Sequence, residues 1–321
     1  MRTLALALIL LASPVLAEEP QYHEVTADAD VSIESGANTA TAGVKYTLSF
    51  GGIDRQDEVI PALRRFVRHP SAVWVRIDRR GSSAVESETS VNVGGILHLF
   101  DGALHLSGEA GVSRNDVLFD DFYGGEDYYD TATYHLELGG RPLPLLSIGA
   151  FFEGEPIIGR SSGTDVASEA NTRDGGAKTI GGVVELSTPD DRLYLHLTGF
   201  YHTVDWTFSG FHPGDITIRG IGGSLQATYQ LDVDAGVGLR TTMSREHWVD
   251  TRMGDNDPLW LGRNLDRQVW NVEIDAEFTF WYRSRFGFRV FLGGGYQEAP
   301  PLIAVTATGF GKFGGGITAR F

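Results

Sequence analysis

The segment RQVWNVEIDAEFTFWY, residues 267–282, decides the fold. Every second residue from position 270 is apolar: Trp270, Val272, Ile274, Ala276, Phe278, Phe280 and Tyr282. The residues between them, except Trp281, are polar or acidic: Asn271, Glu273, Asp275, Glu277 and Thr279. Strict alternation indicates a β-strand with one apolar and one polar face. The alternation is long enough for a strand that crosses a membrane at a tilt, which needs roughly 9–11 residues. Ordinary strands are only about 5–6 residues long.

The same alternation recurs in residues 40–50, 193–202 and 286–297. In addition, Asp101-Gly102 is a dipeptide that favours a two-residue hairpin turn. Pairing the chain outward from this turn places Leu99 opposite Leu104 and His98 opposite His105. Each face then stays apolar or polar along the whole hairpin, as a correct register requires.

Tight turns alternate with longer polar segments along the chain, which is typical of a membrane-spanning barrel. We predict strands near residues 25–34, 40–50, 71–79, 87–99, 103–114, 130–140, 144–155, 177–188, 192–206, 215–230, 232–246, 267–282, 285–297 and 304–321. These make fourteen, and twelve is the alternative if the first two are left out; both counts are even, as in single-chain bacterial barrels. The predicted fold is all-β, a closed antiparallel transmembrane β-barrel.

The first residues predict an export signal. Arg2 precedes an apolar stretch from Leu4 to Leu11, and Val15-Leu16-Ala17 suits a signal-peptidase site. We therefore expect residues 1–17 to be a signal peptide for Sec-type export and residues 18–321 to form one barrel domain. The chain has no cysteine, so its stability after export has to come from packing and backbone pairing.

The last segment, GFGKFGGGITARF at residues 309–321, has Phe313, Ile317 and the terminal Phe321 on one face. It resembles the C-terminal strand of Gram-negative outer-membrane β-barrel proteins, the class that includes porins. The resemblance covers nearly all of the chain after residue 17. It implies a location in the outer membrane, in contact with its lipid and lipopolysaccharide. It also implies that Phe321 is an assembly signal read by the barrel-assembly machinery.

Residues 56–69 have a helical period instead. Their apolar residues are Val59, Ile60, Leu63, Phe66 and Val67, with arginines between them and Pro70 at the end. This pattern predicts a short amphipathic helix between early strands. Three interpretations remain open, namely a cap on the periplasmic rim, a plug inside the barrel and a helix in contact with the membrane.

Aromatic residues near strand ends are expected to form girdles at the two membrane interfaces. On the loop side these are Trp206, Trp248, Trp260 and Trp270, and on the turn side Phe280, Tyr282, Phe286, Phe288 and Phe321.

The polar faces are expected to line the lumen. The predicted lining residues are Lys45, Arg76, Glu88, His98, His105, Glu109, His135, Glu137, Glu153, Glu185, His196, Arg240, Glu273, Asp275, Glu277, Arg289 and Lys312. Acids outnumber bases among them, and a water-filled lumen of this composition favours cations. The alternative is a self-paired charge network that fills the barrel.

Other kinds of chemistry find little support. The net charge of −16 argues against nucleic acid as a partner. His98, His105, His135 and Glu137 are candidates for zinc, but no CxxC or HExxH spacing accompanies them, and we expect no cofactor. Ser209 with His212 and Asp215, or His202 with Asp205, are hydrolase candidates without a recognisable motif, so we do not expect an enzyme.

The sequence therefore predicts a porin-like channel for passive diffusion of small polar solutes or ions, with a mild cation preference. The alternatives are a closed structural or adhesive barrel whose loops bind a partner, and an outer-membrane hydrolase. The solute and the oligomeric state stay open.

Overall fold

The computed structural model is a closed antiparallel barrel of fourteen strands, which confirms the predicted fold class. It describes residues 22–34, 38–50, 71–82, 86–100, 103–118, 126–160, 171–190, 192–210, 214–232, 234–251, 265–282, 285–298 and 308–321. The predicted signal peptide at 1–17 and the predicted helix at 56–69 lie outside these residues. Within them, no helix has the length and apolar character to span a membrane.

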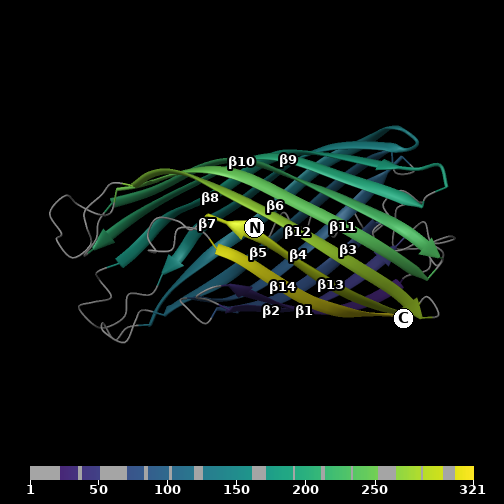
Figure 1. Ribbon diagram of the computed structural model, residues 1–321, viewed down its shortest axis with the longest axis horizontal. Coiled ribbons are helices and arrows are strands. Elements are labelled where there is room, and N and C mark those ends of the chain that lie inside the picture. The colour runs from purple at the N-terminus through teal and green to yellow at the C-terminus, as the bar shows by residue number, and fades with distance from the viewer. Residues whose placement is uncertain are drawn as a thin grey trace.

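The strands follow one another around the barrel in chain order and tilt against its long axis (Figure 1). They are β1 (Tyr22–Glu34), β2 (Asn38–Phe50), β3 (Ser71–Ser82), β4 (Glu86–Leu99), β5 (Leu104–Leu118), β6 (Glu126–Leu143), β7 (Leu146–Arg160), β8 (Asn171–Ser187), β9 (Leu193–Gly210), β10 (Gly214–Asp232), β11 (Ala235–Asp250), β12 (Leu265–Tyr282), β13 (Phe286–Gln297) and β14 (Thr308–Arg320).

The first and last strands close the barrel. β1 pairs with β2 on one side and with β14 on the other. At the closure the hydroxyls of Thr26 and Thr318 lie 3.1 Å apart. Below them the backbone of His23 and Phe321 exchanges two hydrogen bonds, of 3.3 and 2.9 Å. Closure leaves no strand edge with unpaired backbone groups, which is the condition for a sheet to stand in hydrocarbon.

The polar face of the sheet is the inner face. Side chains two strands apart meet there, which only the concave side of a curved sheet allows. Trp74 Nε1 on β3 donates to Glu109 on β5 over 2.6 Å. Thr133 on β6 donates to Asn92 on β4 over 2.8 Å.

The outer face is an apolar band. Large apolar side chains stay about half exposed all around the barrel, for example Val93, Leu138, Leu197, Ile274 and Val290. A soluble protein does not leave so large an apolar surface uncovered. The pattern is that of a barrel whose outer surface contacts lipid.

The strands run further toward the loop side than predicted. The residues between predicted strands at 115–129, 156–176 and 247–266 are partly strand, because β5 reaches Leu118, β8 begins at Asn171 and β11 reaches Asp250. Beyond the apolar band both faces of a strand are polar, so the two-residue period disappears from the sequence while the backbone pairing continues. Arg114 and Asp130 show this: they face each other on the outer surface of β5 and β6, 3.1 Å apart.

The predicted hairpin register is confirmed. Leu99 pairs with Leu104 and His98 with His105. Asp101 and Gly102 themselves lie outside the described residues.

Leu225 and Gln226 test the assignment of the two faces, because they are neighbours at the same depth. Leu225 is exposed on the outer face and Gln226 lies on the inner face. We expect Leu225→Arg to lower the free energy of unfolding by about 2–4 kcal/mol in lipid vesicles, since the charge would enter hydrocarbon. Gln226→Arg should change it by less than about 1 kcal/mol. Urea titration followed by tryptophan fluorescence measures both. Equal losses would contradict the assignment of the faces, and a larger loss for Gln226→Arg would mean that they are reversed.

Candidate functional site

The register places every residue predicted to line the lumen on the inner face. Lys45 pairs with Arg76, Glu185 with His196, and Arg240 with Asp275. Each of the other predicted residues either pairs with an inner-face residue of a neighbouring strand or lies an even number of positions from one on its own strand. All of them therefore share one face of the closed barrel. The inner face is therefore the candidate site, and its charges determine what it can bind or pass.

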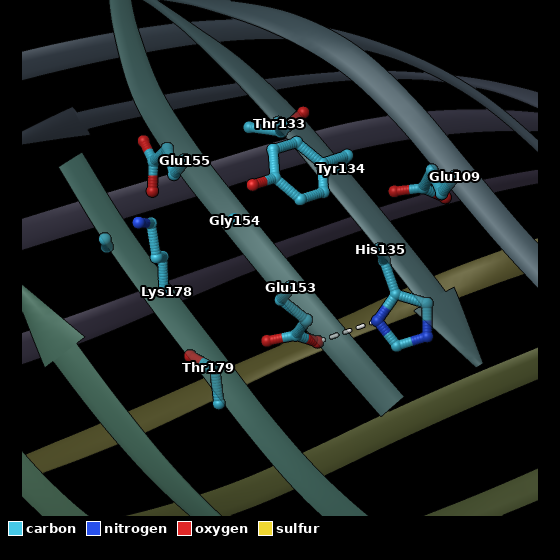
Figure 2. Close-up of a pocket in the computed structure, with 10 residues that line it drawn as sticks. Glu109, Thr133, Tyr134, His135, Glu153, Gly154, Glu155, Lys178 and Thr179 are labelled. Atoms are coloured by element: carbon cyan, nitrogen blue, oxygen red, sulfur yellow. Dashed lines mark hydrogen bonds and ion pairs between the residues drawn. The ribbon is translucent and has the colours of Figure 1, made fainter. Parts of the chain in front are cut away.

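Histidines and carboxylates form a row across β4 to β7. The rings of His98 and His105 lie 5.9 Å apart, and His105 Nε2 lies 3.0 Å from Glu137. Glu137 also approaches His135 at 3.6 Å. His135 Nδ1 in turn lies 2.9 Å from Glu153 on the next strand (Figure 2). Each imidazole in this row contacts a carboxylate or another ring.

A second group of this kind lies on β8 and β9. Tyr194 donates its hydroxyl to Glu185 over 2.7 Å, and His196 Nδ1 lies 3.1 Å from the same carboxylate oxygen. Glu185 is 4% exposed. A carboxylate this deeply buried requires such partners, because burial without them is costly.

Lys312 is the centre of a charged group on the opposite wall. It reaches over β13 to two carboxylates of β12, contacting Glu273 and lying 2.7 Å from Asp275. Gly293 stands between them in the register. A Cβ at Gly293 would collide with the Asp275 carboxylate, so the missing side chain lets the ion pair form.

The charges divide the inner face into two walls. Strands β11 to β14 and β1 to β3 carry acids together with bases, the bases being Arg240, Arg267, Arg289, Lys312, Arg320, Lys45, Arg76 and Arg80. Strands β4 to β8 carry the carboxylates of Glu88, Glu109, Glu137, Glu153, Glu155 and Glu185. Among the described inner side chains of β4 to β10 there is no lysine, and Arg141 beside the β6–β7 turn is the one arginine. We call the inner face of β4 to β8 the acidic wall.

An apolar cluster lies on the inner face at the loop end of β8 to β11. Val204, Ile216 and Ile218 are buried there, packed against Ala177, Trp206 and Trp248. The expectation that Trp206 and Trp248 face lipid in a girdle is therefore wrong. The alternation reverses at this end of β10, where Thr217 and Arg219 point outward and the isoleucines inward. The sequence DITIRG at 215–220 carried that signal.

A cavity of about 230 Å³ lies at β6, β7 and β8 (Figure 2). Its lining combines inner-face residues such as Glu153 and Glu155 with the outer-face residues Tyr134 and Lys178. The β6–β7 ladder passes from the pair of Thr131 directly to the pair of Tyr134. The strand opposite this gap contains Pro156, which has no N–H to donate. Most of the residues that line the cavity lie on the inner face, beside this interruption of the ladder.

Among the described residues, the candidate catalytic pair of His202 and Asp205 and the histidines proposed for zinc do not assemble into a site. His202 lies on the inner face, whereas Asp205 lies on the outer face and pairs with Arg219 at 2.7 Å. His212 lies outside the described residues. Within the described residues no group of three or more His, Asp or Glu side chains is placed to hold a metal ion, and the histidines proposed for zinc form a row instead of converging.

Lys312 should contribute more to stability than Arg289, which also pairs with a carboxylate of β12. Lys312→Gln leaves Glu273 and Asp275 to repel each other in a half-buried position, so we expect a loss of about 1–3 kcal/mol. Arg289 lies 3.8 Å from Glu277, and its side chain is 42% exposed, compared with 19% for Lys312, so Arg289→Gln should cost less than about 1 kcal/mol. Urea unfolding of the refolded barrel compares the two, and equal effects would contradict the assigned role of Lys312.

Comparison with known proteins shows likeness at the level of fold. No family model and no curated protein matches the sequence. Among solved structures, the CymD monoaromatic hydrocarbon channel is 8% identical, with a TM-score of 0.56 over 98% of this chain and 92% of that one. An outer-membrane channel from Pseudomonas putida F1 is 10% identical, with a TM-score of 0.51 over 95% and 97%. A deltaS2 mutant of the TodX monoaromatic hydrocarbon channel is 7% identical, with a TM-score of 0.51 over 96% and 92%. The structures that this chain resembles are thus outer-membrane β-barrel channels of Gram-negative bacteria, the class that the C-terminal strand indicated.

Proposed function

We propose that the protein is a passive channel of the outer membrane for small polar solutes or ions, with a mild preference for cations. The observation that carries the proposal is the acidic wall. Its carboxylates line one side of the barrel, and the bases that the structure describes around them are the histidines already named and Arg141, with no lysine among them. A net negative potential in a low-dielectric enclosure concentrates cations and repels anions.

The fold supports this reading. Its outer face is apolar all around, its backbone is closed, and the structures it resembles are channels. The proposal includes export of the chain by the Sec route, assembly through Phe321 and contact with lipopolysaccharide. It includes no covalent chemistry, in agreement with the separation of His202 from Asp205 on opposite faces.

Glu153 and Glu155 are the residues with which to test the cation preference. We expect Glu153→Gln with Glu155→Gln to lower the permeability ratio of potassium to chloride roughly twofold, because two negative charges leave the acidic wall. The reversal potential across a planar bilayer with a KCl gradient measures the ratio. Asp266→Asn is the matched control, since it removes a charge from the outer face and should leave the ratio unchanged. A bilayer that stays silent with the wild-type protein would contradict the channel itself.

The apolar cluster favours a second candidate, a channel for monoaromatic hydrocarbons. CymD and TodX are described as channels for such compounds. Val204, Ile216 and Ile218 provide an apolar surface on the inner face at the loop end of the barrel. A flat apolar solute is held by a surface of this kind through dispersion and desolvation.

Toluene uptake distinguishes this candidate. Cells that produce the barrel should take up labelled toluene faster than cells that lack it, and Ile216→Thr should slow uptake by making the cluster more polar. Ile221→Thr makes the same change on the outer face and serves as the control. Equal uptake with and without the barrel would eliminate the hydrocarbon candidate.

A further inference from the structure

The phenylalanines of the inner face lie opposite glycines. The structure describes the side chains of four inner-face phenylalanines, and each is the register partner of a glycine on a neighbouring strand. The pairs are Phe151 with Gly181, Phe200 with Gly222, Phe291 with Gly314, and Phe310 with Gly295. Side chains of a strand stand roughly perpendicular to the sheet, so a phenylalanine on this face would ordinarily project into the lumen.

The rings lie over these glycines instead. A Cβ added to Gly222 would stand 2.5 Å from Cζ of Phe200, and a Cβ added to Gly181 would collide with the ring of Phe151. Cζ is the far end of the ring, so the ring reaches across to the next strand, about 4.8 Å away. The pairs on β13 and β14 have the same geometry. Each ring therefore lies along the barrel wall, in space that any larger residue on the neighbouring strand would fill.

Phe200 has a glycine on both sides, but only one of them has room for its ring. Its register partners are Gly181 on β8 and Gly222 on β10. The space beside Gly181 already holds the ring of Phe151. The other partner of Phe151 is Glu137, whose carboxylate lies 3.0 Å from His105. A ring displaced from its glycine thus has no second place on the wall and has to turn into the lumen.

Both rings lie where the proposed channel carries its negative charge. Phe151 belongs to the acidic wall and stands two residues from Glu153, and the ring of His135 lies beside it, with the centroids 5.9 Å apart and the planes inclined by 22°. Phe200 lies on β9, next to that wall. Both phenylalanines are partly exposed, so they line the lumen. A ring that turned inward here would narrow the passage beside the carboxylates.

We propose that Gly181 and Gly222 are positioning residues of the channel, which hold the rings of Phe151 and Phe200 against the wall and so set the width of the lumen beside the acidic wall. The proposal rests on the channel proposed above and adds a size limit for its solute. Pore diameter governs both the conductance and the largest ion that passes. A side chain at either glycine therefore narrows the lumen without changing its charge.

Gly222→Ala in the full barrel, refolded into planar bilayers, tests the proposal. The new methyl group takes the place of the Phe200 ring, so we expect the single-channel conductance in KCl to fall to roughly half of the wild-type value. In tetraethylammonium chloride it should fall to less than roughly a quarter, because this cation is wider than potassium. Gly199→Ala is the matched control. It lies next to Phe200 on the outer face, where a Cβ meets nothing within 4 Å, and should conduct like the wild type.

Removal of the ring separates its effect from that of a backbone shift. A Cβ on Gly222 would also stand 2.9 Å from the carbonyl oxygen of Met243, and that contact is the same with or without the ring. Gly222→Ala combined with Phe200→Ala should therefore regain the wild-type conductance. Phe200→Ala alone should raise it by less than about 1.5-fold, because the ring already lies on the wall. Unchanged conductance in Gly222→Ala, or no recovery in the double variant, would overturn the proposal.

Urea unfolding keeps this result distinct from the fate of the channel. Phe200→Ala should lower the urea midpoint in the wild-type barrel and lower it much less in the Gly222→Ala barrel, where the ring has already left the wall. Equal lowering in both would refute the ring–glycine contact, whether or not the barrel conducts. A conducting wild-type barrel with equal lowering refutes the role of the glycines alone. A silent wild-type barrel with unequal lowering refutes the channel, and the size limit with it, while the contact stands.

Discussion

The closure of β1 onto β14 is the constraint from which the remaining features follow. Once the ladder has no edge, the backbone groups of neighbouring strands find partners within the sheet and the barrel wall needs no water. Successive side chains of a strand point to opposite faces of any sheet, and closure turns these faces into one concave and one convex surface. Residues from Lys45 on β2 to Lys312 on β14 therefore share the inner surface.

Curvature then determines which side chains meet. On the concave face, groups from alternate strands come within hydrogen-bonding distance, as Trp74 and Glu109 do. Where a side chain would block such a contact, the intervening strand has a glycine, as at Gly293 beneath Lys312. The result is a wall of acids and bases on one side of the lumen and the acidic wall on the other. An ion inside the lumen would therefore meet different charges on its two sides.

The convex face is divided along the barrel axis instead. Apolar side chains form its middle, aromatic residues its turn end, and charged residues such as Arg114 and Asp130 its loop end. Because alternation assigns each residue to one face, the charged residues of the outer face are separate from those of the acidic wall, and charge on one face can change without altering the other. Beside Pro156 the pairing of β6 with β7 is interrupted, and residues of both faces line one cavity there.

The sequence by itself determined the class of fold and the face on which each alternating residue lies, because a period of two is a local property of the strand. It favoured fourteen strands and left twelve as the alternative, and the structure has fourteen. Positions such as Leu99 and Leu104 could even be paired, since a tight turn fixes the register of a hairpin. The sequence could not give the strand ends beyond the apolar band. Both faces of a strand are polar there, and the outer face carries residues such as Arg114 and Asp130. Nor could it show that Lys312 meets Asp275 over β13, or that Trp206 turns inward. Those contacts join strands that are not neighbours in sequence or lie where the pattern reverses, so only the curvature and closure of the whole barrel decided them.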